Sequence, residues 1–316
     1  MPAPRPTPLS RRLFLRNAGL LAAGAGGLAL AGCGRSDAPT VGAGTATGSG
    51  SLKVPSKLSF GVGPLLPTTT DTKAAYGPFF AWLASQLGTK HELVAVDSWG
   101  GISVALGSDQ LDVAWMGPFG YVLANARSGA EAVAPAKSDG QPVYHAIIVG
   151  RPDLEVRTWP DDAKGRSISF TEVSSTSGWL VPTHWFKSRG MDPKTYFFRY
   201  TEGASHAANE LAVASGQADF ATDFDRNRRA MIETGRLKAD ANRVVWTSDP
   251  LPNDAIGVRK GLDPALADRI RELLTAMTPE FAATVLPTHY DGFVAATNET
   301  YKPILDAALS VDALKR

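Results

Sequence analysis

Four hydroxyl residues in succession, Ser174 to Ser177, followed by Gly178, form the part of the chain best suited to hold a small anion. A strand-like run over 167–170 precedes them, and a helix-like run over about 177–188 follows. Serine and threonine favour the N-cap of a helix, where free N–H groups and the positive end of the dipole attract anions. Their hydroxyls can donate to anion oxygens and bring no charge of their own. A simpler interpretation, in which these residues only cap the helix, stays open from the local sequence.

The N-terminal segment has the features of a bacterial export signal. Residues 10–16 contain a twin-arginine motif, and an apolar run of small residues follows over 18–31. This run is short and glycine-rich for a membrane span. It ends in Leu30-Ala31-Gly32-Cys33, which resembles a lipobox. We therefore predict a twin-arginine lipoprotein signal peptide over 1–33, with Cys33 lipidated and holding the chain at the membrane.

Charge and cysteine content narrow the class of protein further. Cys33 is the only cysteine, so no intrachain disulfide can form. Removing residues 1–33, which carry four arginines and no acid, changes the formal net charge from +1 to −3. Such a charge argues against a nucleic-acid partner. The Gly-, Ser- and Thr-rich stretch 34–52 predicts a flexible tether, so we expect an exported, lipid-anchored globular protein, periplasmic or at the cell surface.

The rest of the chain alternates between strand-like and helix-like runs, which predicts an α/β fold. Strand-like runs lie at 57–63, 92–96, 111–115, 143–149, 167–170, 196–200, 218–222, 243–246 and 254–258, with a weaker one at 130–134. Helix-like runs lie at 73–87, 101–106, 119–127, 177–188, 206–215, 226–234, 264–277 and 299–314.

These runs fall into two sets of similar size. Stretches with proline or glycine, near 149–152 and 247–252, separate them. We therefore predict two lobes, each a mostly parallel sheet flanked by helices, with lobe 1 over 53–149 and 252–316 and lobe 2 over 150–251. Two chain crossings are typical of a hinged clamshell that binds its ligand between the lobes.

Five short stretches, in order along the chain, resemble the phosphonate and phosphite ABC-transporter solute-binding proteins, a branch of the type II periplasmic binding proteins. They are Tyr76–Phe80, Leu111–Trp115, Ser175–Gly178, Gly203–Ala208 and Ser248–Asp254. The resemblance implies a two-lobe clamshell that is not an enzyme. It also implies a small oxyanion ligand and, as partners, an ABC permease with its ATPase.

The resemblance also implies roles for individual residues. Ser175, Thr176 and Ser177 would grip the phosphonyl oxygens, and His206, just before a helix, would donate to the anion. A surface cap is the alternative for His206. The remaining positions that match ligand residues of the family are an aromatic in lobe 1, a tyrosine near the hinge and an acid after the second crossing, here Trp99, Tyr144 and Asp254. Core packing is the alternative for the two aromatic side chains.

One departure from the family pattern bears on the ligand. Receptors for 2-aminoethylphosphonate carry an acid where this chain has Arg226. An ammonium beside Arg226 would meet like-charge repulsion, so we expect an amine-free anion, phosphite or a short phosphonate. Two alternatives stay open. Arg226 could turn outward and pair with Asp223 or Asp225, or one of these two acids could rotate into the space that the ammonium-binding acid occupies in those receptors.

Other functions remain as competing interpretations. Ser175, His206 and Asp254 could be mistaken for a hydrolase triad, but the chain has no Gly-x-Ser-x-Gly elbow. The histidines are scattered without metal-ligand spacing, and no phosphate-loop or dinucleotide motif occurs, so we expect no metal and no cofactor. Phosphate, selenate or another oxyanion would suit the same cradle. A sensory subunit of a signalling system would use it equally well.

Overall fold

The computed structural model describes residues 52–66 and 68–315. The predicted signal peptide, Cys33 and all but the last residue of the predicted tether therefore lie outside the described residues. No helix within the described ranges combines the length and apolarity needed to cross a membrane.

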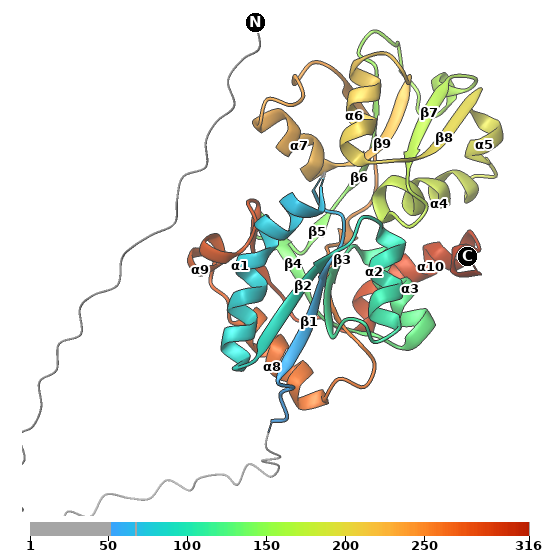
Figure 1. The fold of residues 1–316 in the computed structure, drawn as a ribbon. Helices are drawn as coiled ribbons and strands as arrows, with labels where there is room; N and C mark the ends of the chain where they lie inside the picture. The colour runs from blue at the N-terminus through green and yellow to red at the C-terminus, as the bar shows by residue number, and fades with distance from the viewer. Residues whose placement is uncertain (1–51, 67, 316) are drawn as a thin grey trace, which may run out of the picture. The chain divides into compact units, whose positions relative to one another are not determined.

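The larger of the two main sheets has six strands, in the order β13-β4-β12-β3-β1-β2 (Figure 1). They are β1 (Lys57–Val62), β2 (Lys90–Ala95), β3 (Val113–Met116), β4 (Glu131–Ser138), β12 (Ala255–Val258) and β13 (Tyr290–Phe293). Strand β1 pairs in parallel with β2 and β3, whereas β12 runs antiparallel to both β3 and β4. Strand β13 runs antiparallel to β4.

Helices cover both faces of this sheet because its strands alternate their side chains. Val113 and Trp115 of β3 belong to the hydrophobic cluster that includes α1 (Thr69–Leu87), α8 (Pro264–Thr275) and α9 (Pro279–Val285). Ala114 and Met116 belong to the cluster with α2 (Trp99–Gly107), α3 (Pro118–Ser128) and α10 (Lys302–Ser310). In Figure 1, α1 and α9 lie to the left of the strands, and α2, α3 and α10 lie to their right.

The second sheet has five strands, in the order β10-β6-β9-β7-β8. They are β6 (Ala146–Gly150), β7 (Ser167–Thr171), β8 (Arg199–Ala204), β9 (Phe220–Phe224) and β10 (Arg243–Thr247). Strand β7 is parallel to β8 and β9, and β6 is antiparallel to β9 and β10. The helices of this part are α4 (Val181–Lys187), α5 (Pro193–Tyr196), α6 (His206–Ala214) and α7 (Asp225–Glu233).

The predicted α/β class is confirmed, and the strand pairing refines it. Most strands of each sheet run in one direction, but β6 in the five-stranded sheet and β12 and β13 in the six-stranded sheet run against their neighbours, so both sheets are mixed. The run predicted as one strand over 143–149 is divided. Its first part is β5 (Val143–Tyr144), which pairs antiparallel with β11 (Leu251–Pro252), and its second part is β6 of the five-stranded sheet.

The chain thus changes sheet at His145, earlier than the predicted crossing near 149–152. After β10 ends at Thr247, the chain passes through β11 and re-enters the six-stranded sheet at β12. The division into two lobes with these boundaries stays a prediction. Helix α9 and strand β13 were not predicted, and the predicted helix over 299–314 is a shorter α10 between two 3₁₀ turns, Asn298–Tyr301 and Ala313–Lys315.

The hydroxyl-rich stretch forms a π-helical turn, Thr176–Leu180, that leads into α4. The Leu180 N–H donates to the Ser175 carbonyl at 3.0 Å, and the Val181 N–H donates to the Thr176 carbonyl. Pro182 follows and has no N–H to donate. Wide turns of this kind open the backbone and are frequent at functional sites.

Gly178 allows this turn to lie against β7. A Cβ atom at position 178 would stand 2.0 Å from Thr171 Oγ1 and 2.5 Å from Thr171 Cγ2. Both distances are far below van der Waals contact, so only glycine fits without a shift of the strand or the turn.

We expect Gly178→Ala to destabilise the protein by about 1–3 kcal/mol because the added methyl group forces the turn away from Thr171. Gly77→Ala in α1 is the matched control, since no atom lies within 4 Å of its Cβ position. Alanine there should stabilise the helix by about 0.5–1 kcal/mol. Denaturant unfolding of both variants measures these changes, and equal stabilities would contradict the steric argument.

Candidate functional site

All eight residues predicted to contact a ligand line one small cavity of about 30 Å³: Trp99, Tyr144, Ser175, Thr176, Ser177, His206, Arg226 and Asp254. Leu65, Gly117 and Phe224 complete the lining. The contributing residues come from elements of both main sheets and from β5. The structure therefore brings together side chains from positions spread over more than 150 residues of sequence.

The hydroxyl turn presents buried oxygens to this cavity. Ser175 is the N-cap of the π turn, and its Oγ accepts the Gly178 N–H at 3.2 Å. Thr176 Oγ1 accepts the N–H of Phe119, in the first turn of α3, at 2.8 Å. This leaves the Thr176 O–H proton to donate to another acceptor. Both side chains are thereby held in place while their hydroxyl protons can still rotate.

Burial sets the protonation state of His206, the histidine next to this turn. His206 is the first residue of α6, and its Nε2 lies 3.2 Å from Ser175 Oγ. Its Nδ1 lies 2.9 Å from Oδ1 of Asp223, a fully buried residue near the end of β9. Desolvation lowers the pKa of His206 to about 4, since burial penalises the imidazolium. The imidazole is therefore neutral at pH 7.

A second acid stands behind Asp223. Glu210 of α6 is fully buried, hydrogen-bonds to Asn242, and also hydrogen-bonds to Asp223. Its Oε1 atom has no donor among the described residues, and two carboxyl groups can share a hydrogen bond only if one holds a proton. Desolvation, followed by the hydrogen bond to Asp223, raises the pKa of Glu210 to about 9, and burial raises the pKa of Asp223 to about 7. Glu210 is therefore the protonated partner at neutral pH.

Ser175, His206 and Asp223 have the connectivity of a hydrolase triad, but the acid is Asp223. The set that could be mistaken for a triad from sequence, with Asp254, is therefore not the one that the structure brings together. Asp254 lies in a different group of contacts, and Ser175 Oγ also accepts the N–H of Gly178.

Asp254 is paired with Arg226. Nη2 of Arg226 lies 3.9 Å from Asp254 Oδ2 and donates to Asn253 Oδ1 at 2.8 Å. Asp254 Oδ2 also accepts the Tyr290 hydroxyl at 2.6 Å. Asp254 thus has a cation beside it at the cavity wall.

Arg226 points inward and does not pair with Asp223 or Asp225 through its side chain. Only its backbone N–H bonds to Asp225, at 2.8 Å. The guanidinium lies 5.2 Å from the ring centres of both Tyr144 and Tyr290. Burial alone would lower the pKa of Arg226, but Tyr290 and Asp254 outweigh it and raise the pKa, so the cation persists. Its Nε atom has no partner among the described residues, which leaves one buried donor unsatisfied beside the cavity.

Trp99 begins α2 and packs its ring on two glycines. Its ring atoms lie 2.6 Å from the Cβ position of Gly63 and 3.3 Å from that of Gly117, so larger residues there would push the indole toward the cavity. Its backbone N–H donates to Oε1 of Glu172 at 2.8 Å. Burial raises the pKa of Glu172, although this hydrogen bond opposes the shift.

Sequence reasoning missed Glu172, Glu210 and Tyr290, and assigned no partner role to Asn253. Glu172 directly precedes the hydroxyl run, which is the one local signal that could have singled it out. Nothing in the sequence marks Glu210, because its importance arises from burial beside Asp223. In the described ranges no group of three or more potential metal ligands is arranged around one point.

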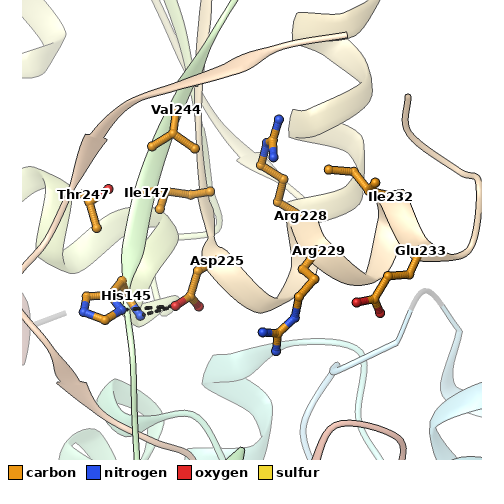
Figure 2. Close-up of a pocket in the computed structure, with 9 residues that line it drawn as sticks. All are labelled: His145, Ile147, Asp225, Arg228, Arg229, Ile232, Glu233, Val244 and Thr247. Atoms are coloured by element: carbon orange, nitrogen blue, oxygen red, sulfur yellow. Dashed lines mark hydrogen bonds and ion pairs between the residues drawn. The ribbon is translucent and has the colours of Figure 1, made fainter. Parts of the chain in front are cut away.

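A wider depression of about 590 Å³ lies along α7 and shares none of the eight residues. Figure 2 shows Arg228 and Arg229 extending in opposite directions from this helix, with His145 bonded to Asp225 below β6. Arg228 donates to Asn242 at 2.9 Å, and Arg229 pairs with Asp139 at 2.6 Å. Because these cations already have partners, this depression is a weaker anion site than the small cavity.

Residues 65–301 match the family model described as the periplasmic substrate-binding protein of the phosphonate ABC transporter. The chain belongs to this family. It is 28% identical over 216 residues to the "Phosphate-import protein PhnD" of Mycolicibacterium smegmatis, covering 65% of this chain and 67% of that protein. It is also 28% identical over 245 residues to the "Phosphonates-binding periplasmic protein" of Escherichia coli, covering 76% of this chain and 72% of that protein.

Solved structures agree on the fold. A binding-protein component of an ABC phosphonate transporter from Pseudomonas aeruginosa matches with a TM-score of 0.72 and 24% identity, over 82% of this chain and 87% of that one. PhnD1 of Prochlorococcus marinus, in complex with methylphosphonate, matches with a TM-score of 0.72 and 17% identity, over 82% and 99%. The chain is thus an exported substrate-binding component of an ABC transporter with the type II periplasmic-binding-protein fold, and not an enzyme.

The protonated state of Glu210 has a consequence for stability. The folded state holds this proton up to about pH 9, whereas an unfolded glutamate releases it near its ordinary pKa of 4.5. The contribution of this group is therefore complete below about pH 4.5 and is lost as the pH rises toward 9. Glu210→Gln imitates the protonated acid and should remove this loss.

We compare the free energy of unfolding of Glu210→Gln with that of wild type at two pH values. The difference, variant minus wild type, should be at least about 1 kcal/mol larger at pH 8 than at pH 5. Denaturant unfolding at both pH values measures this difference. Glu272→Gln, at an exposed position of α8, controls for the general loss of one negative charge. A difference between Glu210→Gln and wild type that does not change with pH would contradict a protonated Glu210.

Proposed function

We propose that this chain is the lipid-anchored, extracytoplasmic receptor of an ABC importer for a small, amine-free phosphorus oxyanion, phosphite or a short phosphonate. The small cavity lined by Ser175, Thr176 and Ser177 would hold the anion and pass it to the permease and its ATPase. The observation that carries the choice of ligand is the inward, buried side chain of Arg226.

Arg226 acts against an amine in two ways. It fills this part of the cavity wall with a guanidinium, which offers an ammonium group neither an acceptor nor a negative charge. It also pairs with Asp254, the acid that could otherwise receive that ammonium. For an anion the same side chain is favourable, because its unsatisfied Nε donor can reach an oxygen.

The aromatic residues favour a ligand with one apolar group. The Trp99 ring and Tyr144 line the cavity beside the hydroxyl turn. Their faces suit a P–H or methyl group better than a fourth charged oxygen. Inorganic phosphate is the second candidate, since one relative is named for phosphate import and since Arg226 would serve phosphate as well.

A thermal-shift panel separates these ligands. Phosphite or methylphosphonate should raise the melting temperature at concentrations where 2-aminoethylphosphonate has little effect, because a ligand at about 100 times its Kd adds roughly 2.7 kcal/mol. Arg226→Met should reduce the gap between methylphosphonate and 2-aminoethylphosphonate, while Arg229→Met, on the same helix but outside the cavity, should preserve it. A larger shift with the amine than with the other ligands would overturn the argument from Arg226, and a larger shift with phosphate would select the second candidate.

The membrane anchor is proposed on the motif Leu30-Ala31-Gly32-Cys33 alone. We expect wild-type protein from membrane fractions to begin at an acylated Cys33, and Cys33→Ser to lack the lipid. Mass spectrometry of the N-terminal peptide measures this. An unmodified cysteine in wild-type membrane fractions would contradict the anchor.

A further inference from the structure

The two ring nitrogens of His206 have different partners, which fixes where its proton lies. Asp223 receives the Asn227 amide at 3.0 Å and 2.9 Å on its two oxygens and hydrogen-bonds to the carboxyl of Glu210. Glu210 supplies the proton of that hydrogen bond, so above its own pKa of about 7 Asp223 is a carboxylate that only accepts. His206 Nδ1, 2.9 Å away, must therefore carry the imidazole proton.

Nε2 of His206 is consequently a lone pair directed at Ser175 Oγ, 3.2 Å away, on the cavity wall. The Ser175 hydroxyl donates to it, so neither group offers a proton to an incoming anion in this state. A fully deprotonated oxygen placed here would meet a lone pair, and that arrangement is repulsive. An oxygen that carries a proton would donate to Nε2 and replace the Ser175 hydroxyl, which is then free to donate to the anion.

Charges around His206 do not change this outcome. Asp223 and Glu210 lie behind it, and Arg228 of α7 acts on both of these acids. Glu172 faces it from the loop before the π turn and is held by the N–H groups of Trp99 and Gly100. Arg226 and Asp254, across the cavity, balance each other. No group in this set supplies a second proton donor at Nε2.

We propose that the protein binds its oxyanion together with one proton, held between an anion oxygen and Nε2 of His206, and that Asp223 determines this by fixing the imidazole tautomer. The inference rests on the proposed function, because it concerns how the same cavity recognises its ligand. Asp223 is a positioning residue that acts through His206. The consequence is selection by protonation: a phosphonate monoanion, with one P–O–H group, fits, whereas an anion of the same shape and charge without that proton does not.

Methylphosphonate and methanesulfonate test this directly. The monoanions have the same shape and charge, but only methylphosphonate carries an ionisable proton. Calorimetry in buffers of different ionisation enthalpy measures both affinity and protons taken up. At about pH 8, where free methylphosphonate is largely the dianion and Asp223 is ionised, we expect uptake approaching one proton per bound ligand. At neutral pH methanesulfonate should bind at least tenfold more weakly than methylphosphonate.

Asp223→Asn should change this behaviour without removing the site. The introduced amide can donate to Nδ1, so the imidazole proton moves to Nε2 and faces the cavity. Proton uptake at about pH 8 should then fall by at least half. The ratio of the affinities for methylphosphonate and methanesulfonate should fall several-fold. Asp219→Asn, just before the same strand and outside the cavity, is the matched control and should behave as wild type.

The tautomer can be observed without any variant. Nitrogen NMR of the wild-type protein should show His206 neutral with its proton on Nδ1 at pH 8, where Asp223 is ionised. A proton on Nε2, binding of methylphosphonate without proton uptake at about pH 8, or equal affinity for methanesulfonate would each overturn the inference while leaving the proposed function intact. Failure of both phosphite and methylphosphonate to bind the wild-type protein would instead overturn the proposed function.

Discussion

Loss of water from charged groups is the constraint on which this site depends. Arg226, Asp254, Asp223 and Glu210 all lie at or near full burial, where an unpaired charge would cost several kcal/mol. Each group avoids an unpaired buried charge in a different way. Arg226 and Asp254 pair with each other, and Glu210 keeps a proton. Asp223 takes donors from His206 and Asn227. The result is a cavity wall close to neutral, in which the hydroxyls of the π turn are the main uncharged donors.

This balance requires the late part of the chain to reach the cavity. Asn253 and Asp254 lie between β11 and β12, and β12 inserts between β3 and β4 of the larger sheet. The Tyr301 hydroxyl donates to the Asn253 carbonyl at 3.0 Å and holds the segment from behind. Arg226 arrives from the start of α7, after β9. The ion pair is thus set by two strands in different sheets, and both sheets must be formed before it can exist.

The fold class and the hydroxyl turn could be predicted because they leave local signals: alternating runs indicate an α/β fold, and hydroxyls between a strand and a helix predict an anion cradle. The other cavity residues came from the resemblance to a known family: Trp99, Tyr144, His206, Arg226 and Asp254. The partners of these residues could not be predicted. The pairing of Arg226 with Asp254, and of His206 with Asp223, depends on contacts between distant strands. The π turn was missed because it arises from the close approach of Gly178 to Thr171, which no periodicity reports. Strand β13 and helix α9 are short, and their residues acquire their order from packing on β4 and α1.

The position of β12 has a consequence for the order in which the protein can fold. Strands β3 and β4 are complete by residue 138, yet each has an open edge until residues 255–258 are added between them. A nascent chain that stops before β12 leaves β3 unpaired on one side and β4 on both sides, because β13 also comes later, and such edges favour pairing with other chains. The larger sheet is consequently a late, non-local structure with high contact order, whereas β7, β8 and β9 with their hydroxyl turn can assemble from a continuous segment. The hydroxyl turn can therefore form before residues 253–258, which complete the cavity wall around Asp254, have been synthesised.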